Sequence, residues 1–186
     1  MMQTPASPCL RYRLFFALKP PHGVARRTDH LAAALAEGVP RIRTEHQHIT
    51  LAITGDHAAY PREAACRLLQ AAETIMAAPF HLRLDRLSFS TRSAALRPSR
   101  AVQGLNALQR ALVRAIEEAG VMLRTGWRFS PHQTLFYRAG PVGHRPVEGF
   151  GWCVEDFALI CSHVGRTRHE ELGRWPLKGG AQLSLF

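Results

Sequence analysis

Lysine is almost absent from this chain. Of its 24 lysine and arginine residues only Lys19 and Lys178 are lysines, and 14 acidic residues leave a formal net charge of +10. Arginine presents a planar fork of donors that matches phosphate, and a basic surface favours an anionic partner, with nucleic acid as the leading candidate. Genome base composition alone would also favour arginine over lysine, so the net charge is the stronger indication.

The chain also lacks the features of disulfide-stabilised, secreted and membrane proteins. No apolar run approaches the length of a membrane span, and the first eight residues lack the basic and apolar regions of a signal peptide. The four cysteines are far apart, form no C-x-x-C pair and are expected to be reduced thiols: Cys9, Cys66, Cys153 and Cys161. We therefore expect a cytoplasmic protein without a membrane association.

Hydrophobic patterning predicts an α+β fold with mostly antiparallel strands. Apolar and alternating runs predict strands over residues 11–18, 43–53, 80–89, 93–97, 128–137, 152–163 and 170–177. Apolar residues at helical spacing predict helices over residues 23–37, 61–78 and 99–119, the last capped by Ser99. The strands over residues 43–53 and 128–137 each follow a helix, which indicates a duplicated lobe. We expect one bilobal domain over residues 11–178, between a flexible start (1–10) and a tail (179–186).

The pattern His-x-Thr-Leu occurs twice, once in each half: His48-Ile49-Thr50-Leu51 and His132-Gln133-Thr134-Leu135. Side chains at i and i+2 of a strand point to the same face, so each copy would place an imidazole beside a hydroxyl. A lone histidine on a half-buried strand is usually structural, but the repetition favours catalysis. Two such strands facing each other offer two proton-transfer groups and two hydrogen-bond donors, a set suited to phosphoester chemistry without a metal.

In this context the motifs resemble those of the two-histidine (2H) phosphoesterases, and among them the RNA 2′,3′-cyclic phosphodiesterases, also called 2′-5′ RNA ligases. The resemblance extends from Arg11 to Leu177. It includes residues 13–18 as a first strand, 84–87 before a central hairpin, and 172–177 as a closing strand. It implies an α+β, bilobal fold with two antiparallel-rich sheets and flanking helices around a central cleft.

The resemblance also implies a reaction, the hydrolysis of RNA 2′,3′-cyclic phosphate ends to 2′-phosphate ends without metal or cofactor. His48 would donate a proton to the leaving oxygen, His132 would accept one from water, and Thr50 and Thr134 would bind the phosphate oxygens. Histidine titrates near neutrality, so one ring can be charged while the other is neutral. Ligation of 2′-5′ ends, or hydrolysis of a small cyclic nucleotide, would use the same site. The alternative of another class is a non-catalytic module that binds RNA or DNA ends.

Further substrate contacts are expected from His46, Tyr137 and Arg138. His46 and His48 form a His-x-His pair, but without a third ligand nearby this pair predicts no metal site. The family often carries a phosphate-binding arginine where this chain has Tyr137. Arg138 follows one position later, on the opposite face unless the strand bulges, so Arg128 or another arginine could replace it. Near the closing strand, His169 stands where the family often has a tyrosine.

The last five residues, Gln182, Leu183, Ser184, Leu185 and Phe186, resemble the peptide with which bacterial replication and repair proteins bind the sliding clamp. A glycine-containing spacer would present the peptide, and its apolar residues would enter pockets on the clamp. The alternative is that the tail folds back and buries these residues on the domain. We expect a monomer whose partners are RNA and, through this tail, the clamp. In the non-catalytic alternative, the same tail would tether the module that binds RNA or DNA ends to the clamp.

Overall fold

The structure, a computed structural model, describes residues 10–138 and 140–179. The elements follow the order β1 (Arg11–Leu18), α1 (His22–Ala36), a 3-10 turn (Thr44–His46), β2 (Ile49–Ile53), α2 (Arg62–Glu73), β3 (Phe80–Phe89), β4 (Ser93–Arg97), α3 (Gln103–Glu118), β5 (Gln133–Tyr137), β6 (Gly143–Val154), β7 (Asp156–Val164) and β8 (Arg168–Pro176). The clamp-binding prediction for residues 182–186 lies outside the described residues and stays a prediction.

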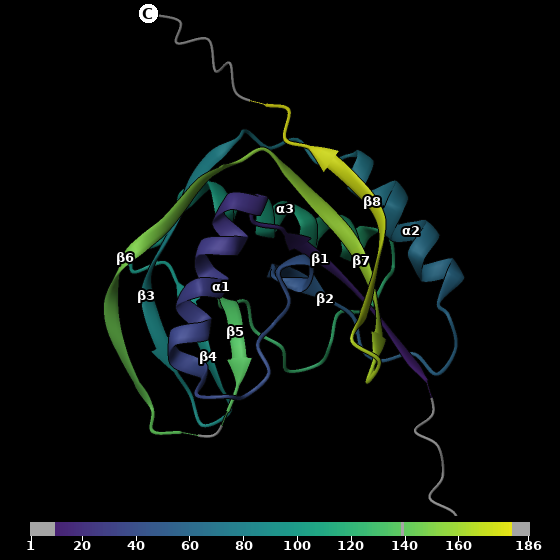
Figure 1. Cartoon of the computed structure of the whole chain (residues 1–186). Coiled ribbons are helices and arrows are strands. Elements are labelled where there is room, and N and C mark those ends of the chain that lie inside the picture. The colour runs from purple at the N-terminus through teal and green to yellow at the C-terminus, as the bar shows by residue number, and fades with distance from the viewer. Residues whose placement is uncertain (1–9, 139, 180–186) are drawn as a thin grey trace, which may run out of the picture.

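The strands form one antiparallel sheet in the order β6-β3-β4-β5-β2-β1-β7-β8. Its two four-stranded halves, β6-β3-β4-β5 and β2-β1-β7-β8, are joined in this ladder by a single residue pair, Ile49 with Gln133. In Figure 1 the first half curves around the left of the molecule and β7 and β8 lie on the right. The predicted α+β class is confirmed, and the two predicted sheets are the two halves of one continuous sheet.

Each helix packs an apolar stripe against the sheet. The stripe predicted for α3 is buried and consists of Leu105, Leu108, Leu112 and Ile116. The three helices divide the sheet between them, α1 lying on β5 and β6, α2 on β8, and α3 on β2 and β3. The buried side chains of both halves form one large cluster, which makes the two halves one packing unit.

Several predicted boundaries are wrong. The two motif strands begin later than expected, so that His48 and His132 lie directly before β2 and β5. The predicted helix over 61–78 ends at Glu73, and the predicted strand over 152–163 is the end of β6 and most of β7. Most of β6 was not predicted, because the first part of this edge strand is exposed and carries a proline, which an edge tolerates.

The predicted cap of α3 is also wrong. The helix begins at Gln103 after Val102, with no side-chain cap. Ser99 instead bonds to Asp85 of β3, its N–H at 2.7 Å from Oδ1 and its hydroxyl at 2.8 Å from Oδ2. A serine side chain can form hydrogen bonds either within a loop or at a helix N-terminus. Here Ser99 forms the loop bonds, which hold the β4–α3 connection against the sheet.

Both motif strands contain a β-bulge at the leucine that follows the threonine. Leu51 has no partner in β1 and Leu135 has none in β4, because the register shifts by one residue at each. A bulge interrupts the alternation of a strand, and each leucine and the residue after it are therefore both buried. As a result, the side chain of Ile53, rather than that of Ala52, lies on the same face of the sheet as Thr50. In the same way Tyr137, rather than Phe136, lies on the face of Thr134.

The close contact between α3 and β3 gives a stability prediction. A Cβ atom added at Gly104 would lie 2.5 Å from Cβ of Phe80, which the β3 backbone holds in place. We expect Gly104→Ala to lower the free energy of unfolding by about 1–3 kcal/mol, since overpacking costs this much and exceeds the gain of removing a helical glycine. Gly23→Ala in α1, where nothing lies within 4 Å, is the control and is expected to be neutral or stabilising. Urea unfolding measures both variants, and equal effects would contradict the packing argument.

Candidate active site

A cavity of about 440 Å³ opens where the two halves of the sheet meet. His48 and Thr50 line it from β2 and the residue before it, and His132 and Thr134 line it in the same way from β5. Both imidazoles are half-buried, so neither is sealed in the hydrophobic core. The structure therefore brings the four residues of the repeated motif together around one cavity.

Each imidazole is oriented by the same local hydrogen bond. Nδ1 of His48 lies 2.7 Å from the carbonyl oxygen of His46, and Nδ1 of His132 lies 2.7 Å from that of Ser130. Because a carbonyl can only accept, Nδ1 carries the hydrogen in both rings and Nε2 is the nitrogen available for proton exchange. In both cases the carbonyl belongs to the residue two positions before the histidine, and the distance is the same. The two halves of the site therefore have the same local geometry.

Burial makes both imidazoles weaker bases than a free histidine. It lowers the pKa of His48 to about 4, although the bond to the His46 carbonyl favours the charged ring and partly opposes this effect. Burial also lowers the pKa of His132, again against its carbonyl bond, and the Arg97 guanidinium lowers it further. In the absence of an anion, both rings are therefore mainly neutral at pH 7.

A further histidine completes one wall of the cavity. The ring of His169, on β8, lies 4.7 Å from that of His46 and 5.5 Å from that of His48, measured between centroids, and its edge meets Phe15 at 5.4 Å. Burial first, and then the neighbouring His48 and His46, lower the pKa of His169 to about 4. His46 lines the cavity as predicted. His169 was not among the predicted site residues, although its position, where the family often has a tyrosine, was a signal for it.

The arginines lie differently from the prediction. Because β5 bulges at Leu135, Tyr137 faces the cavity, while Arg138 points to Glu37 with a 2.9 Å contact and does not line the cavity. Arg128 does not line it either. The arginine in the lining is Arg13 of β1, whose Nε lies 2.6 Å from Oδ1 of Asp56. The prediction missed Arg13 because on the sequence alone it is one polar residue in an apolar strand.

The described part of the chain has neither a metal-binding cluster of side chains nor a membrane-spanning helix. No group of three or more His, Cys, Asp or Glu side chains is arranged to hold a metal ion within residues 10–138 and 140–179. In the same part of the chain, no helix combines the length and the hydropathy needed to cross a membrane.

Comparison with known proteins identifies the family. The family model described as the 2′-5′ RNA ligase superfamily matches residues 20–148, more than half of the chain. With its fold and its paired histidines, the chain belongs to the 2′-5′ RNA ligase superfamily of two-histidine phosphoesterases. The resemblance on which the sequence interpretation rested is thereby confirmed. No curated protein sequence matched the chain.

Solved structures give the same result over nearly the whole chain. Escherichia coli LigT complexed with 3′-AMP is 26% identical and superposes with a TM-score of 0.74, over 90% of this chain and 98% of that one. The protein TT0787 of Thermus thermophilus is 25% identical, with a TM-score of 0.73 over 90% of this chain and 98% of that one. The similarity therefore extends over both halves of the sheet.

The lowered pKa of His169 gives a prediction for acid stability. A histidine whose pKa is about 4 when folded and near its ordinary 6.5 when unfolded takes up its proton more readily in the unfolded chain. Its contribution to stability is therefore complete above pH 6.5 and is lost as the pH falls toward 4. In His169→Phe, which keeps an aromatic ring beside Phe15, we expect a smaller loss of stability between pH 6.5 and 4 than in the parent protein. Thermal unfolding from about pH 8 to about pH 4 measures it, and parallel curves for the two proteins would refute it.

Proposed function

We propose that this protein hydrolyses RNA 2′,3′-cyclic phosphate ends to 2′-phosphate ends by paired histidine acid–base catalysis, with no metal in the reaction. The observation that carries the proposal is the meeting of two equivalent His–Thr pairs, one from each half of the sheet, at one cavity. Membership of the 2′-5′ RNA ligase superfamily supports the general chemistry. Structures of E. coli LigT with 3′-AMP and with phosphate support a nucleotide phosphate as the ligand.

The proposed reaction moves one proton through each imidazole. Nε2 of His132 takes a proton from the attacking water as the new bond to phosphorus forms. On the other side of the phosphorus, the bond to O3′ breaks and Nε2 of His48 gives O3′ a proton, which leaves the phosphate on O2′. Thr50 and Thr134 donate hydrogen bonds to the non-bridging oxygens, where negative charge develops. The anionic phosphate itself raises the pKa of the neighbouring rings, which offsets the lowering caused by burial.

A cluster of arginines at one end of the cavity favours RNA over a small cyclic nucleotide. The pKa of Asp56 is lowered by its hydrogen bond from Arg13 and by the charges of Arg124 and Arg11, so three guanidinium groups lie near this one carboxylate. Arg166 in the β7–β8 turn and Arg168 at the start of β8 are exposed, next in sequence to Gly165 and Thr167, which line the cavity. This excess of positive charge would attract the phosphates of an RNA strand that continues out of the cavity.

Replacement of either catalytic histidine tests the reaction. We expect His48→Ala and His132→Ala each to lower kcat by ~10²–10⁴-fold, since each removes one proton transfer. The assay uses an RNA with a 2′,3′-cyclic phosphate end, in the presence of EDTA, and maps the phosphate in the product. His81→Ala, an exposed histidine of β3 outside the cavity, is the control.

The same assay separates the alternatives. A 2′-5′ linkage formed when an RNA with a 5′-hydroxyl end is added would favour ligation as the activity. Turnover of 2′,3′-cyclic AMP but not of RNA would favour a small cyclic nucleotide. Intact RNA that remains bound to the parent protein would instead favour a non-catalytic module that binds RNA or DNA ends.

The arginine cluster predicts a dependence on substrate length. We expect the double variant Arg166→Gln, Arg168→Gln to lose about tenfold in kcat/KM on a cyclic-phosphate RNA of about ten nucleotides, since phosphate contacts contribute to binding. Turnover of 2′,3′-cyclic AMP should change little, and the loss on RNA should shrink as salt is raised. The control changes the same charge on α3, outside the cavity, with Arg110→Gln and Arg114→Gln. A loss that is equal for the two substrates would count against an RNA path at this end.

A further inference from the structure

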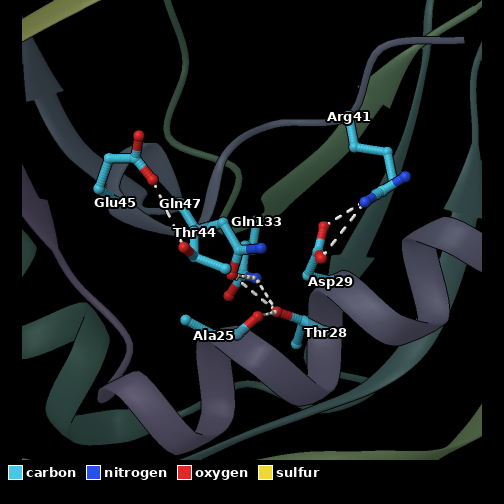
Figure 2. Close-up of polar contacts among 8 residues, drawn as sticks. All are labelled: Ala25, Thr28, Asp29, Arg41, Thr44, Glu45, Gln47 and Gln133. Atoms are coloured by element: carbon cyan, nitrogen blue, oxygen red, sulfur yellow. Dashed lines mark hydrogen bonds and ion pairs between the residues drawn. The ribbon is translucent and has the colours of Figure 1, made fainter.

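A buried triad of polar side chains lies directly behind the paired histidines. Thr28 on α1, Gln47 before β2 and Gln133 on β5 are 0%, 1% and 0% exposed. The Thr28 hydroxyl lies 2.7 Å from Oε1 of Gln47, and Nε2 of Gln133 lies 3.0 Å from both of these oxygens. Figure 2 shows the three side chains converging above α1, so that three separate segments of the chain meet in one set of hydrogen bonds.

The position of the triad relates it to the active site. Gln47 is the residue before His48, and Gln133 is the residue after His132. Successive residues of an extended chain point to opposite faces, and accordingly the histidines line the cavity while the glutamines are buried on the side of α1. A movement of either glutamine is therefore transmitted through one peptide unit to the adjoining imidazole.

The triad also crosses the weakest part of the sheet. The backbones of β2 and β5 pair only at Ile49 and Gln133. Before β2, the bridge from Arg41 to Phe136 and the 2.8 Å bond from the Ile42 N–H to the Leu135 carbonyl add backbone contacts farther along β5. Beside the histidines themselves, the bond between the two glutamine amides is the polar side-chain contact that spans the junction.

Stability alone does not account for these residues. Oε1 of Gln133 is buried without a hydrogen-bond partner in the described structure, which is costly. A buried polar network that is only partly satisfied is often no more stable than apolar side chains of the same shape. Its hydrogen bonds do, however, require defined distances and angles between the segments that make them, which apolar packing does not require.

We infer that Thr28, Gln47 and Gln133 are positioning residues, which set the separation and the relative orientation of the His48 and His132 imidazoles. The inference rests on the proposed function for its catalytic readout. In-line attack needs the two Nε2 atoms on opposite sides of one phosphorus atom. A misplacement of about 1 Å in such a geometry can cost ~10²-fold in rate. Loss of the triad is therefore expected to lower kcat much more than it raises KM.

The sharpest test changes Thr28, which does not line the cavity. Thr28→Val keeps the shape of the side chain and removes the hydroxyl, whereas Thr28→Ser keeps the hydroxyl. We expect kcat to fall about tenfold in the valine variant and to stay within about twofold of the parent in the serine variant. Asp29→Asn is the control, because it weakens the exposed contact of Asp29 with Arg41, which also ties α1 to the segment before β2. Equal kcat values in the valine and serine variants would overturn the inference.

A double variant separates positioning from stability. Gln47→Leu with Gln133→Leu replaces both amides by apolar side chains of similar size, a change that can be nearly neutral for stability. We expect an unfolding temperature close to that of the parent and a kcat lower by about 10- to 100-fold. Parental kcat in a double variant that is fully folded would show that the triad positions nothing.

A direct measurement of geometry separates this inference from the proposed function. Crystal structures of the parent, Thr28→Val and Thr28→Ser give the distance between Nε2 of His48 and Nε2 of His132, with inorganic phosphate added as the probe. We expect this distance to change in the valine variant only, while phosphate affinity, like KM, changes little. If the parent does not hydrolyse cyclic-phosphate RNA, the proposed function fails while the inference is still decided by these distances. An unchanged distance in the valine variant would reject the inference even in an active enzyme.

Discussion

The junction between β2 and β5 is the constraint on which the active site depends. Within the halves of the sheet, β2 pairs with β1 and β5 pairs with β4 along most of their lengths. The two strands pair with each other at one position only, Ile49 with Gln133. A longer ladder would bring the strands into full contact and fill the space that the cavity occupies. A junction without any pairing would leave the two histidines free to move apart. The single pair, supported from behind by α1, keeps the cavity open and its walls in register.

Burial, rather than net charge, dominates the electrostatics of the cavity. In a chain with a formal charge of +10, repulsion from neighbouring cations alone would lower a histidine pKa. For His48, His132 and His169, however, loss of water is the largest effect, and charges such as Lys19 and Arg97 add to it. Neutral imidazoles cost less free energy in a partly dehydrated cavity than protonated ones. An anion that enters the cavity raises the pKa of the imidazoles and so favours their protonation.

The sequence allowed the prediction of the parts that follow from local periodicity and from the repeated motif. The fold class, most elements and the meeting of His48 with His132 depend on alternation along single strands and on a pattern that occurs twice. Features that depend on a second strand could not be predicted. The bulge at Leu135 exists only relative to β4, and it decides that Tyr137 faces the cavity and Arg138 does not. Gln47 and Gln133 have no sequence signal, because a buried glutamine is recognisable only from its partners in space.

The matching bulges at Leu51 and Leu135 have a consequence for the choice of nucleophile in the proposed reaction. They give the site an approximate twofold symmetry, in which each half presents the same ring, the same hydroxyl and the same carbonyl support to the cavity. In the proposed reaction His132 accepts a proton from the attacking oxygen and His48 gives one to the departing oxygen, and neither role depends on the group that carries the attacking oxygen. Opening the cyclic ester with water and joining it to the 5′-hydroxyl of another RNA would then be the same displacement of O3′ by two different nucleophiles, and the nucleophile supplied would decide the product.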